Sequence, residues 1–303
     1  MSVRSAVRSA LGGYSGEIRW EESMTRHTSL GIGGPAEAMV FPSRKEEVTD
    51  LVKRAEGEGI TYVPLGCGSN LLVRDGGLRG IVINLTRFSD CRDLDGDRIW
   101  AEGGMSYPRL STRAQERGLS GLEFAIGIPG TVGGAVVMNA GIPDAETKDQ
   151  LEEVTLVGEG GKVVTLPREA IAFGYRTAKL PRGVVIAASF RLRRSTPEEV
   201  GERVRRLLAR RRETQPLSFP NVGSIFRNPP GRHAGRLIEE AGLKGATRGG
   251  AQISERHANF IINRGGASAA DVLALIELAR RAVFEKFGVS LETEVRVEGV
   301  DEV

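Results

Sequence analysis

The chain has 303 residues, of which 40% are hydrophobic, 27% charged and 5% aromatic, and its formal net charge is +3. This length suffices for two or three domains, whereas so few aromatic residues argue against a stacking platform for single-stranded nucleic acid. No apolar run reaches membrane-spanning length and the N-terminus lacks the apolar segment of a secretory signal, so we expect a cytoplasmic protein.

The first part of the chain predicts short strands and two helices. One helix follows residue 43, with Ser43 as its N-cap and Glu46 completing a capping box. The other covers residues 106–117, with Pro108 in its first turn and Gly118 as its stop. Apolar residues at helical spacing form the core face of the first helix: Val48, Leu51, Val52 and Ala55. Strands are predicted within residues 28–42 and at 61–65, 81–85 and 99–102.

The second part of the chain predicts strands at residues 154–157, 162–166 and 184–192, with a hairpin turn at 159–162. Thr196 and Pro197 then begin an arginine-rich helix that runs to about residue 212. Ser268 and Asp271 begin another helix, which stops at Gly288, and residues 291–300 alternate like a strand. Strands and helices do not alternate strictly, which disfavours a doubly wound parallel sheet.

Two glycine-rich loops, residues 64–73 and 125–141, carry almost no charge. Glycine permits positive φ and lets main-chain N–H groups face an anion, so we expect both loops to hold the diphosphate of a dinucleotide cofactor. The alternative is that the glycines serve tight turns and close packing. Residues 31–36 fit G-x-G-x-x-A but lead into a strand, which argues against the Rossmann fingerprint. We expect Cys67, in the first loop, to be a buried thiol rather than a disulfide or metal ligand.

Polar residues in five segments are candidates for chemistry. The sequence NVGSIFRNP, residues 221–229, places Ser224, Arg227 and Asn228 after a glycine, although a serine there is often a plain turn residue. The sequence FGYR places Arg176 at the tip of an aromatic segment, where it either meets a ligand or stacks on its neighbouring tyrosine.

The remaining candidates lie near the C-terminus and on the arginine-rich helix. Glu294 belongs to a segment in which residues 292, 294, 296 and 298 are expected to share one strand face. His257 has no partner at metal-ligand spacing, so we expect no metal site and a structural or substrate-side role. The arginines of residues 203–212 predict a solvated helix face rather than an RNA site, because Val200 and Val204 face a core.

The ordered set of motifs carries a resemblance. From about residue 28 to 297 these segments follow one another: TSLGIGGPAEAMVFP, PLGCGSNLLV, FAIGIPGTVGGAVVMNAG, FGYR, QPLSFPNVGSIFRNP, GLKG, HANFIIN and LETEVRV. The set resembles the UDP-N-acetylenolpyruvoylglucosamine reductase family, flavoenzymes of peptidoglycan synthesis, in the shorter class that lacks an extra tyrosine-bearing loop. The resemblance implies an α+β fold, with a two-part FAD-binding unit of the vanillyl-alcohol-oxidase (PCMH) type and a smaller α+β substrate domain.

The resemblance also implies domain limits and ligands. We expect FAD-binding subdomains at residues 1–84 and 85–195, with the C-terminal strand returning to the first, and a substrate-binding domain at 196–303. The cofactors would be FAD and NADPH, and the substrate UDP-N-acetylglucosamine enolpyruvate, which is reduced to UDP-N-acetylmuramate. We expect a monomer with no nucleic-acid or membrane partner.

The family's site residues map onto positions of this sequence. Its catalytic arginine, serine and glutamate fall on Arg176, Ser224 and Glu294. Cofactor contacts are predicted at Gly66, Cys67, Gly68, Ser69, Asn70, Gly127, Ile128, Pro129, Gly130, Thr131, Gly133, Gly134, Ala135 and Asn139. Substrate contacts are predicted at Tyr175, Arg227, Asn228, Gln252, His257 and Asn259.

The sequence departs from the family at Thr214, where relatives often carry lysine, so Arg211, Arg227 or Lys244 would supply that cation. Ser224 would protonate the substrate and Arg176 would hold its carboxylate. Glu294 would either donate a hydrogen bond as a protonated acid or orient Arg176. Two alternatives stay open: a flavin oxidase with flavin tethered through Cys67, and an RNA-binding module based on the arginine-rich helix.

Overall fold

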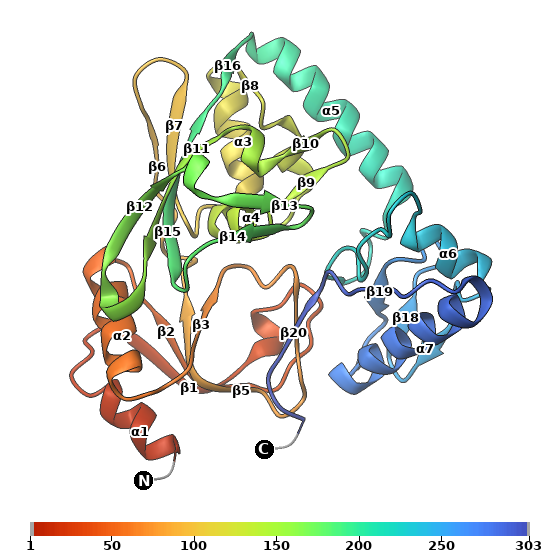
Figure 1. Ribbon diagram of the computed structural model, residues 1–303, viewed down its shortest axis with the longest axis horizontal. Coiled ribbons are helices and arrows are strands. Elements are labelled where there is room, and N and C mark those ends of the chain that lie inside the picture. Colours follow the sequence, from red (N-terminus) through yellow and green to blue (C-terminus); the bar gives the residue numbers. More distant parts are fainter. Residues whose placement is uncertain (1–2, 302–303) are drawn as a thin grey trace. The chain divides into compact units, whose positions relative to one another are not determined.

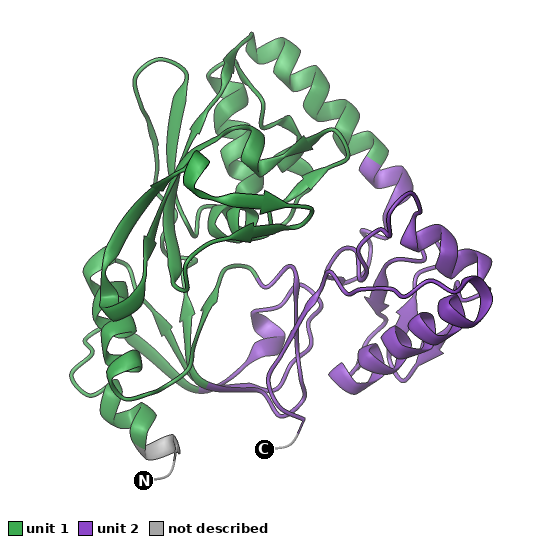
Figure 2. Ribbon diagram, in the orientation of Figure 1, with its two compact units in different colours: residues 1–20, 37–67, 80–210 green, residues 21–36, 68–79, 211–303 purple. Residues whose placement is uncertain are grey.

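The computed structural model of this chain describes residues 3–301 (Figure 1). The chain divides into two compact units, each assembled from segments that are separate in the sequence (Figure 2). Unit 1 comprises residues 1–20, 37–67 and 80–210, and unit 2 comprises residues 21–36, 68–79 and 211–303. The domain limits expected at residues 84 and 195 stay a prediction.

The first core of unit 1 lies under helices α1 (Val3–Ala10) and α2 (Lys45–Gly57). A four-stranded sheet supports them in the order β1 (Glu17–Ser23), β2 (Pro35–Phe41), β5 (Leu78–Asn84) and β3 (Tyr62–Leu65), with β3 and β5 parallel. The predicted apolar stripe of α2 is buried, as expected. The predicted cap is wrong: α2 begins after Arg44, which is its N-cap and makes no side-chain cap bond, while the Ser43 N–H donates to the Glu47 carboxylate at 2.7 Å.

The second core of unit 1 lies on a five-stranded sheet. Its order is β12 (Val163–Pro167), β11 (Leu151–Val157), β15 (Val184–Arg191), β7 (Arg98–Glu102) and β6 (Cys91–Asp93), all antiparallel. The predicted hairpin between β11 and β12 is confirmed, with a short 3-10 turn at Glu159–Gly161. Helices α3 (Tyr107–Glu116) and α4 (Val132–Val137) pack their apolar residues into this core.

Several two-residue and three-residue strands complete unit 1. They form hairpins and bridges between β9 (Gly141–Ile142) and β10 (Ala145–Glu146), β13 (Ala172–Gly174) and β14 (Thr177–Lys179), and β8 (Leu119–Ser120) and β16 (Arg193–Arg194). Further 3-10 turns lie at Glu123–Gly127, Thr147–Asp149 and Arg168–Ala170. The arginine-rich helix α5 (Pro197–Thr214) follows β16 and buries Val200 and Val204, as the sequence predicted.

Unit 2 has its own core beneath helices α6 (Ala234–Glu240) and α7 (Ala269–Phe287). Three strands pair in the order β17 (Thr247–Arg248), β18 (Ala251–Ile253) and β19 (Ile261–Asn263), and β20 (Arg296–Glu298) pairs in parallel with β4 (Leu71–Val73). A 3-10 turn lies at Met24–Arg26. The strand predicted for residues 291–300 is therefore too long: only Arg296 and Glu298 of the four predicted face residues lie in a strand.

The helix starts predicted for α3, α5 and α7 are confirmed. Ser106 accepts from the Arg109 N–H at the start of α3, and Thr196 accepts from the Glu199 N–H at the start of α5. Ser268 and Asp271 form the predicted capping box of α7, and Gly288 ends that helix with φ +64°.

Candidate functional site

Ser224 lies in an extended segment of unit 2 that hydrogen bonds to chain on both sides. The Ile225 N–H donates to the Asn259 carbonyl at 2.8 Å on one side, and the Ile225 carbonyl accepts from the Glu294 N–H at 2.8 Å on the other. Gly223, just before the serine, has φ +79°, a conformation that favours glycine. These backbone contacts fix the position of Ser224 without using its hydroxyl.

Glu294 belongs to the same backbone framework. Besides its N–H bond to Ile225, its carbonyl accepts from the Asn70 side-chain amide at 3.0 Å. The Asn70 carbonyl in turn accepts from the Arg296 N–H at 3.1 Å, immediately before β20 pairs with β4. The structure thus brings two of the predicted catalytic residues, Ser224 and Glu294, onto adjoining segments, and Asn70 of the first glycine loop holds the segment of Glu294.

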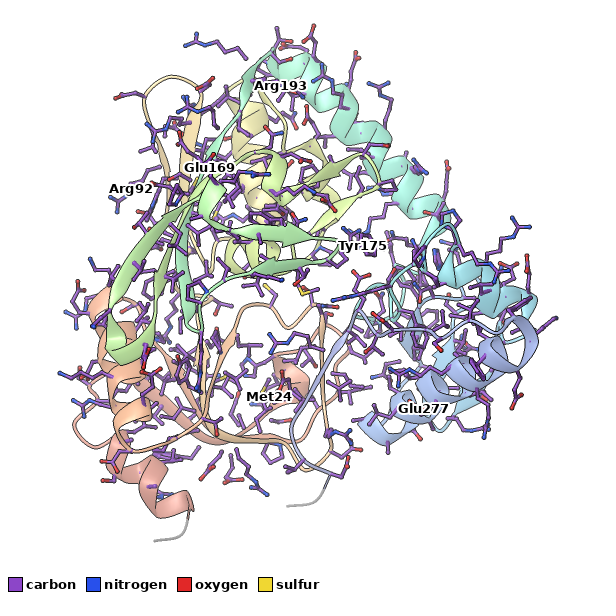
Figure 3. All side chains as sticks on the ribbon, viewed as in Figure 1. Met24, Arg92, Glu169, Tyr175, Arg193 and Glu277 are labelled. Carbon is purple, nitrogen blue, oxygen red and sulfur yellow. The ribbon has the colours of Figure 1, made fainter. Side chains whose placement is uncertain are left out.

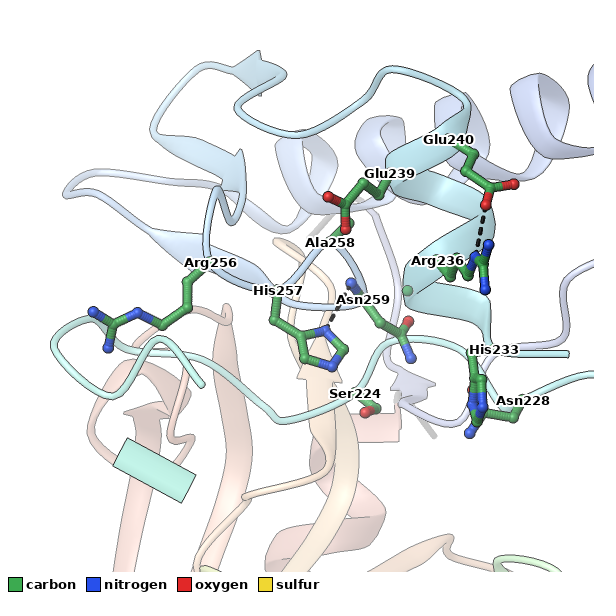
Figure 4. A pocket seen from close by; sticks show the side chains of 11 residues that line it. Ser224, Asn228, His233, Arg236, Glu239, Glu240, Arg256, His257, Ala258 and Asn259 are labelled. Atoms are coloured by element: carbon green, nitrogen blue, oxygen red, sulfur yellow. Dashed lines mark hydrogen bonds and ion pairs between the residues drawn. The ribbon is translucent and has the colours of Figure 1, made fainter. Parts of the chain in front are cut away.

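A pocket of about 600 Å³ opens beside Ser224 in unit 2 (Figure 4). That volume falls within the range of small-molecule sites. Its lining is mostly polar: Ser224, Asn228, His233, Gly235, Arg236, Glu239, Glu240, Arg256, His257, Ala258 and Asn259. Three predicted substrate contacts, Asn228, His257 and Asn259, are therefore among its walls. Gln252 is not, since its amide donates to the Gly245 carbonyl at 3.2 Å.

His257 presents a neutral ring to this pocket. Burial lowers the pKa of His257, and the nearby Lys244 ammonium lowers it further. The Asn259 N–H donates to Nδ1 at 3.2 Å (Figure 4), which leaves the ring proton on Nε2. The ring also packs edge-on against Phe260, with 4.9 Å between the centroids. His257 can therefore offer an N–H donor to a ligand without adding charge.

Asn259 and Arg227 differ in how their side chains are engaged. The Asn259 amide accepts from the Phe226 N–H at 2.9 Å and donates to the Phe226 carbonyl at 2.8 Å, so it braces the segment of Ser224. The Arg227 Nε is buried and finds no hydrogen-bond acceptor among the described residues. Because buried donors are normally paired, this observation favours a ligand at Arg227.

The glycine loops of unit 1 touch each other. A Cβ built on Gly66 would lie 2.4 Å from Oγ1 of Thr131, so the first loop passes the second only because residue 66 is glycine. Within the second loop, the amides of Val132, Gly133 and Ala135 donate to the carbonyls of Met105, Gly103 and Thr131. These three amides are already paired within the protein, so a diphosphate held by this loop would use other amides.

Close packing explains some of the glycines instead. A Cβ on Gly133 would lie 3.1 Å from the Gly103 carbonyl oxygen and 3.2 Å from that of Val185. Because residue 133 has no side chain, α4 can pack close to the sheet of unit 1. Residues 66, 130 and 133 carry no side chains, so a cofactor at these loops would meet main chain there. The individual cofactor contacts stay a prediction.

Two predicted cofactor residues have environments that the sequence did not indicate. Cys67 is a free cysteine but is exposed, which corrects the expectation of a buried thiol; the surrounding chain still raises the pKa of its thiol by desolvation. Asn139 is fully buried with φ +42°, and its amide donates to the Glu146 carboxylate at 3.0 Å and to the Gly174 carbonyl at 3.1 Å.

Arg176 lies in unit 1 at the tip of the β13–β14 hairpin. Gly174 pairs with Thr177, so Tyr175 and Arg176 form a two-residue turn, and Figure 3 shows Tyr175 at its tip. Arg176 has φ +56°, which is rare for a residue with a side chain. Its guanidinium donates to the Gly141 carbonyl at 2.6 Å and lies 5.1 Å from the Tyr175 ring centroid. The structure thus shows both the predicted stacking of Arg176 on its neighbouring tyrosine and a hydrogen bond from Arg176 to the Gly141 carbonyl.

The structure also adds site residues that sequence reasoning missed. His233, Arg236, Glu239 and Arg256 line the pocket, and α6 together with the loop at residues 254–259 positions them. Gly235 leaves space for the His257 ring, since a Cβ there would lie 2.9 Å from its Cε1. The signal available in the sequence was the helical spacing of residues 235, 236, 239 and 240 beside the predicted Asn228.

The candidates for a cation in place of Thr214 occupy different surroundings. Burial lowers the pKa of Arg211, whose Nε donates to the Gln215 amide oxygen at 2.8 Å. Lys244 pairs with Glu239 at 2.7 Å. Within residues 3–301, no group of three His, Cys, Asp or Glu side chains could hold a metal ion. In that same part of the chain, no helix is both long enough and apolar enough to cross a membrane.

Known families match both parts of the chain. A family described as "FAD binding domain" matches residues 36–167, and one described as "UDP-N-acetylenolpyruvoylglucosamine reductase, C-terminal domain" matches residues 215–298. Curated proteins named UDP-N-acetylenolpyruvoylglucosamine reductase are similar over almost the whole length. The protein from Geobacter metallireducens is 45% identical, covering 94% of this chain and 95% of that protein, and one from Clostridium botulinum is 43% identical, covering 92% of each.

A solved structure shows the same architecture. The crystal structure of UDP-N-acetylenolpyruvylglucosamine reductase from Thermus caldophilus is 40% identical in sequence and superposes with a TM-score of 0.80, covering 93% of this chain and 98% of that chain. Together with the FAD binding domain match, this likeness confirms the predicted fold class, an FAD-binding unit joined to a smaller α+β domain.

Proposed function

The chain belongs to the UDP-N-acetylenolpyruvoylglucosamine reductase family, and we propose that it reduces UDP-N-acetylglucosamine enolpyruvate to UDP-N-acetylmuramate in peptidoglycan synthesis. The observation that carries this proposal is the 45% identity over 94% of the chain, joined to a 600 Å³ polar pocket beside Ser224. FAD and NADPH are the cofactors. When bound, FAD reduced by NADPH would supply hydride chemistry, and the glycine loops at residues 64–73 and 125–141 would hold it.

The protein's own residues supply the proton and the charge stabilisation. Ser224 Oγ donates a proton to the carbon next to the one that receives the hydride, so the carbon–carbon double bond becomes a single bond. Its rigid backbone position favours this role, because proton transfer depends first on geometry. Arg176 binds the substrate carboxylate, where its planar guanidinium makes paired hydrogen bonds.

Glu294 and the pocket residues complete the proposal. Glu294 either donates a hydrogen bond as a protonated acid or orients Arg176, and its carbonyl bond to Asn70 holds its backbone in place for either role. Asn228, Arg227 and His257 bind the nucleotide sugar, with support from their place in or beside the pocket and from the unpaired Arg227 Nε. In place of the family lysine at residue 214, Arg227 is the cation with an unsatisfied buried donor.

We further propose that the enzyme is a cytoplasmic monomer without a nucleic-acid or membrane partner. Nucleotide sugars and NADPH are water-soluble, and α5, the arginine-rich helix, buries Val200 and Val204 while Arg203 pairs with Glu123 at 3.1 Å. Light scattering tests the monomer. If the protein bound RNA tightly, with an affinity that fell steeply as the salt concentration rose, this would contradict a purely structural role for α5.

Anaerobic stopped-flow spectroscopy on the purified holoenzyme tests the function. We expect NADPH to bleach a flavin absorbance and the enolpyruvyl sugar to restore it. In Ser224→Ala, bleaching should persist while reoxidation slows by at least about 100-fold. Reoxidation at the native rate would refute the role of Ser224, and a colourless protein or flavin that stays in an acid pellet would refute the wider proposal.

A further inference from the structure

The turn that carries Arg176 is joined to a second hairpin of unit 1. Its guanidinium Nη2 donates to the Gly141 carbonyl at 2.6 Å, and Gly141 pairs with Glu146 in the β9–β10 hairpin. In the opposite direction, the Asn139 amide donates to the Gly174 carbonyl at 3.1 Å, at the base of the Arg176 turn. Two polar contacts therefore hold the two hairpins against each other.

Asn139 has little capacity left for any other partner. Both of its amide hydrogens are used, on the Glu146 carboxylate and the Gly174 carbonyl, and its oxygen accepts from the Lys148 N–H at 3.1 Å. The residue is fully buried. Its left-handed backbone would be unfavourable in isolation and is maintained by these contacts.

Glu146 is the anion at the centre of this cluster. Its carboxylate accepts from Asn139 at 3.0 Å, pairs with the Lys148 ammonium at 2.6 Å and lies 3.8 Å from Arg176 Nη1. It also accepts from the Asp149 N–H in the capping box of the Thr147–Asp149 turn. The side chains of Glu146 and Arg176 are only 18% and 16% exposed, so solvent screens their interaction less than at an open surface.

The arrangement constrains Arg176 more strongly than an ordinary hairpin tip. A positive φ is unfavourable for a residue with a side chain, and the contacts of the Arg176 guanidinium help to maintain it here. If the Glu146 carboxylate were lost, Arg176 would keep the Gly141 contact but lose this carboxylate at 3.8 Å from Nη1. The guanidinium would then be held less firmly in its present rotamer.

We propose that Glu146, held by Asn139 and Lys148, is a positioning residue that fixes the guanidinium of Arg176 for the carboxylate of the substrate. This inference rests on the proposed function, in which Arg176 binds that carboxylate. Glu146 acts through Arg176 and does not touch the reacting atoms. Its removal should therefore weaken ligands that carry the carboxylate and spare those that lack it.

Titration calorimetry on the holoenzyme with two nucleotide sugars tests the proposal. UDP-N-acetylmuramate carries a carboxylate on its lactyl ether, and UDP-N-acetylglucosamine does not. We expect Glu146→Gln to weaken the first about tenfold and the second less than about twofold, because the charge is lost but the shape is kept. Glu146→Asp should restore part of the affinity. Glu169→Gln, an exposed glutamate of the same unit (Figure 3), is the matched control and should change neither.

The double variant separates positioning from a structural role. If Glu146 acts through Arg176, adding Glu146→Gln to Arg176→Ala should cause no further loss for the carboxylated ligand. Equal losses in both backgrounds, or equal losses for both ligands, would overturn the proposal. If Arg176→Ala itself leaves the carboxylated ligand unaffected, the proposed role of Arg176 fails; if Arg176→Ala weakens it and Glu146→Gln does not, only the role of Glu146 fails.

Discussion

Replacing Asn259 tests whether its side chain stabilises the segment of Ser224 or contacts the substrate. In the structure its amide makes two hydrogen bonds to the backbone of Phe226, at 2.9 and 2.8 Å, and Phe226 is 2% exposed. Asn259→Ala strands a buried donor and a buried acceptor. Each stranded group costs about 1–3 kcal/mol, so the variant should lose about 2–6 kcal/mol of unfolding free energy. We expect the segment of Ser224 to loosen with it.

The assay must follow unit 2, because both tryptophans, Trp20 and Trp100, belong to unit 1. Urea unfolding is therefore monitored by far-ultraviolet circular dichroism, with hydrogen exchange of residues 222–227 as the local readout. Asn228→Ala is the matched control: its side chain accepts one bond, from the Ala234 N–H at 3.0 Å, and should cost only about 1 kcal/mol.

The two variants should differ in opposite ways for stability and binding. Asn228→Ala should mainly raise the KM for the nucleotide sugar, since the residue lines the pocket. Should Asn259→Ala unfold at the same urea concentration as the native protein while ligand affinity falls, the bracing role assigned to Asn259 is refuted and a direct substrate contact replaces it.

Three further predictions concern stability and reactivity. Gly77→Ala should lower the unfolding free energy, measured in urea, by more than about 2 kcal/mol, because a Cβ there would lie 1.9 Å from the Pro35 carbonyl oxygen. In the control Gly288→Ala the new Cβ would have no atom within 4 Å, and the loss should be about 1 kcal/mol. Equal losses in the two variants would contradict the packing argument. Ser268→Ala should lower helix stability by about 1 kcal/mol through loss of its cap on α7, and an unchanged urea midpoint would exclude that cap energy. Cys67 is exposed and the pKa of its thiol is raised, so its alkylation should be slow at pH 7 and should accelerate as rising pH forms the thiolate. Bound FAD should block the alkylation. Rapid labelling at pH 7, or no protection by FAD, would count against Cys67 as an exposed cofactor contact with a raised pKa.

Local signals predicted the parts of this fold that depend on neighbouring residues. The caps Ser106 and Ser268 and the apolar stripe of α2 are read from spacings of three or four residues, and the structure confirms them. The cap predicted at Ser43 was also read from a short spacing, but it is wrong. The Ser43 N–H donates to the Glu47 carboxylate, and Arg44 is the residue before α2. The spacing alone did not show which of Ser43 and Arg44 would be the N-cap.

The site was less accessible to sequence reasoning because its contacts join distant segments. Asn70 reaches the carbonyl of Glu294, and Asn139 reaches that of Gly174, across 224 and 35 residues. The sequence singled out Asn70, Asn139 and Glu294 as candidates but did not indicate their hydrogen-bond partners. Residues 291–295 looked like a strand, yet they bond to single residues near Ser224 instead of forming a regular ladder.

The composition of unit 2 has a consequence for synthesis of the protein. Its core joins Leu30 and Leu72 to residues between Val222 and Val295, which leave the ribosome much later. Roughly 220 residues separate the segment ending at residue 79 from Val295, and their synthesis at about 5–20 residues per second takes on the order of ten to forty seconds. During that interval the apolar side chains of Leu30 and Leu72 lack their core partners, so the core of unit 2 cannot be completed until Val295 has been synthesised.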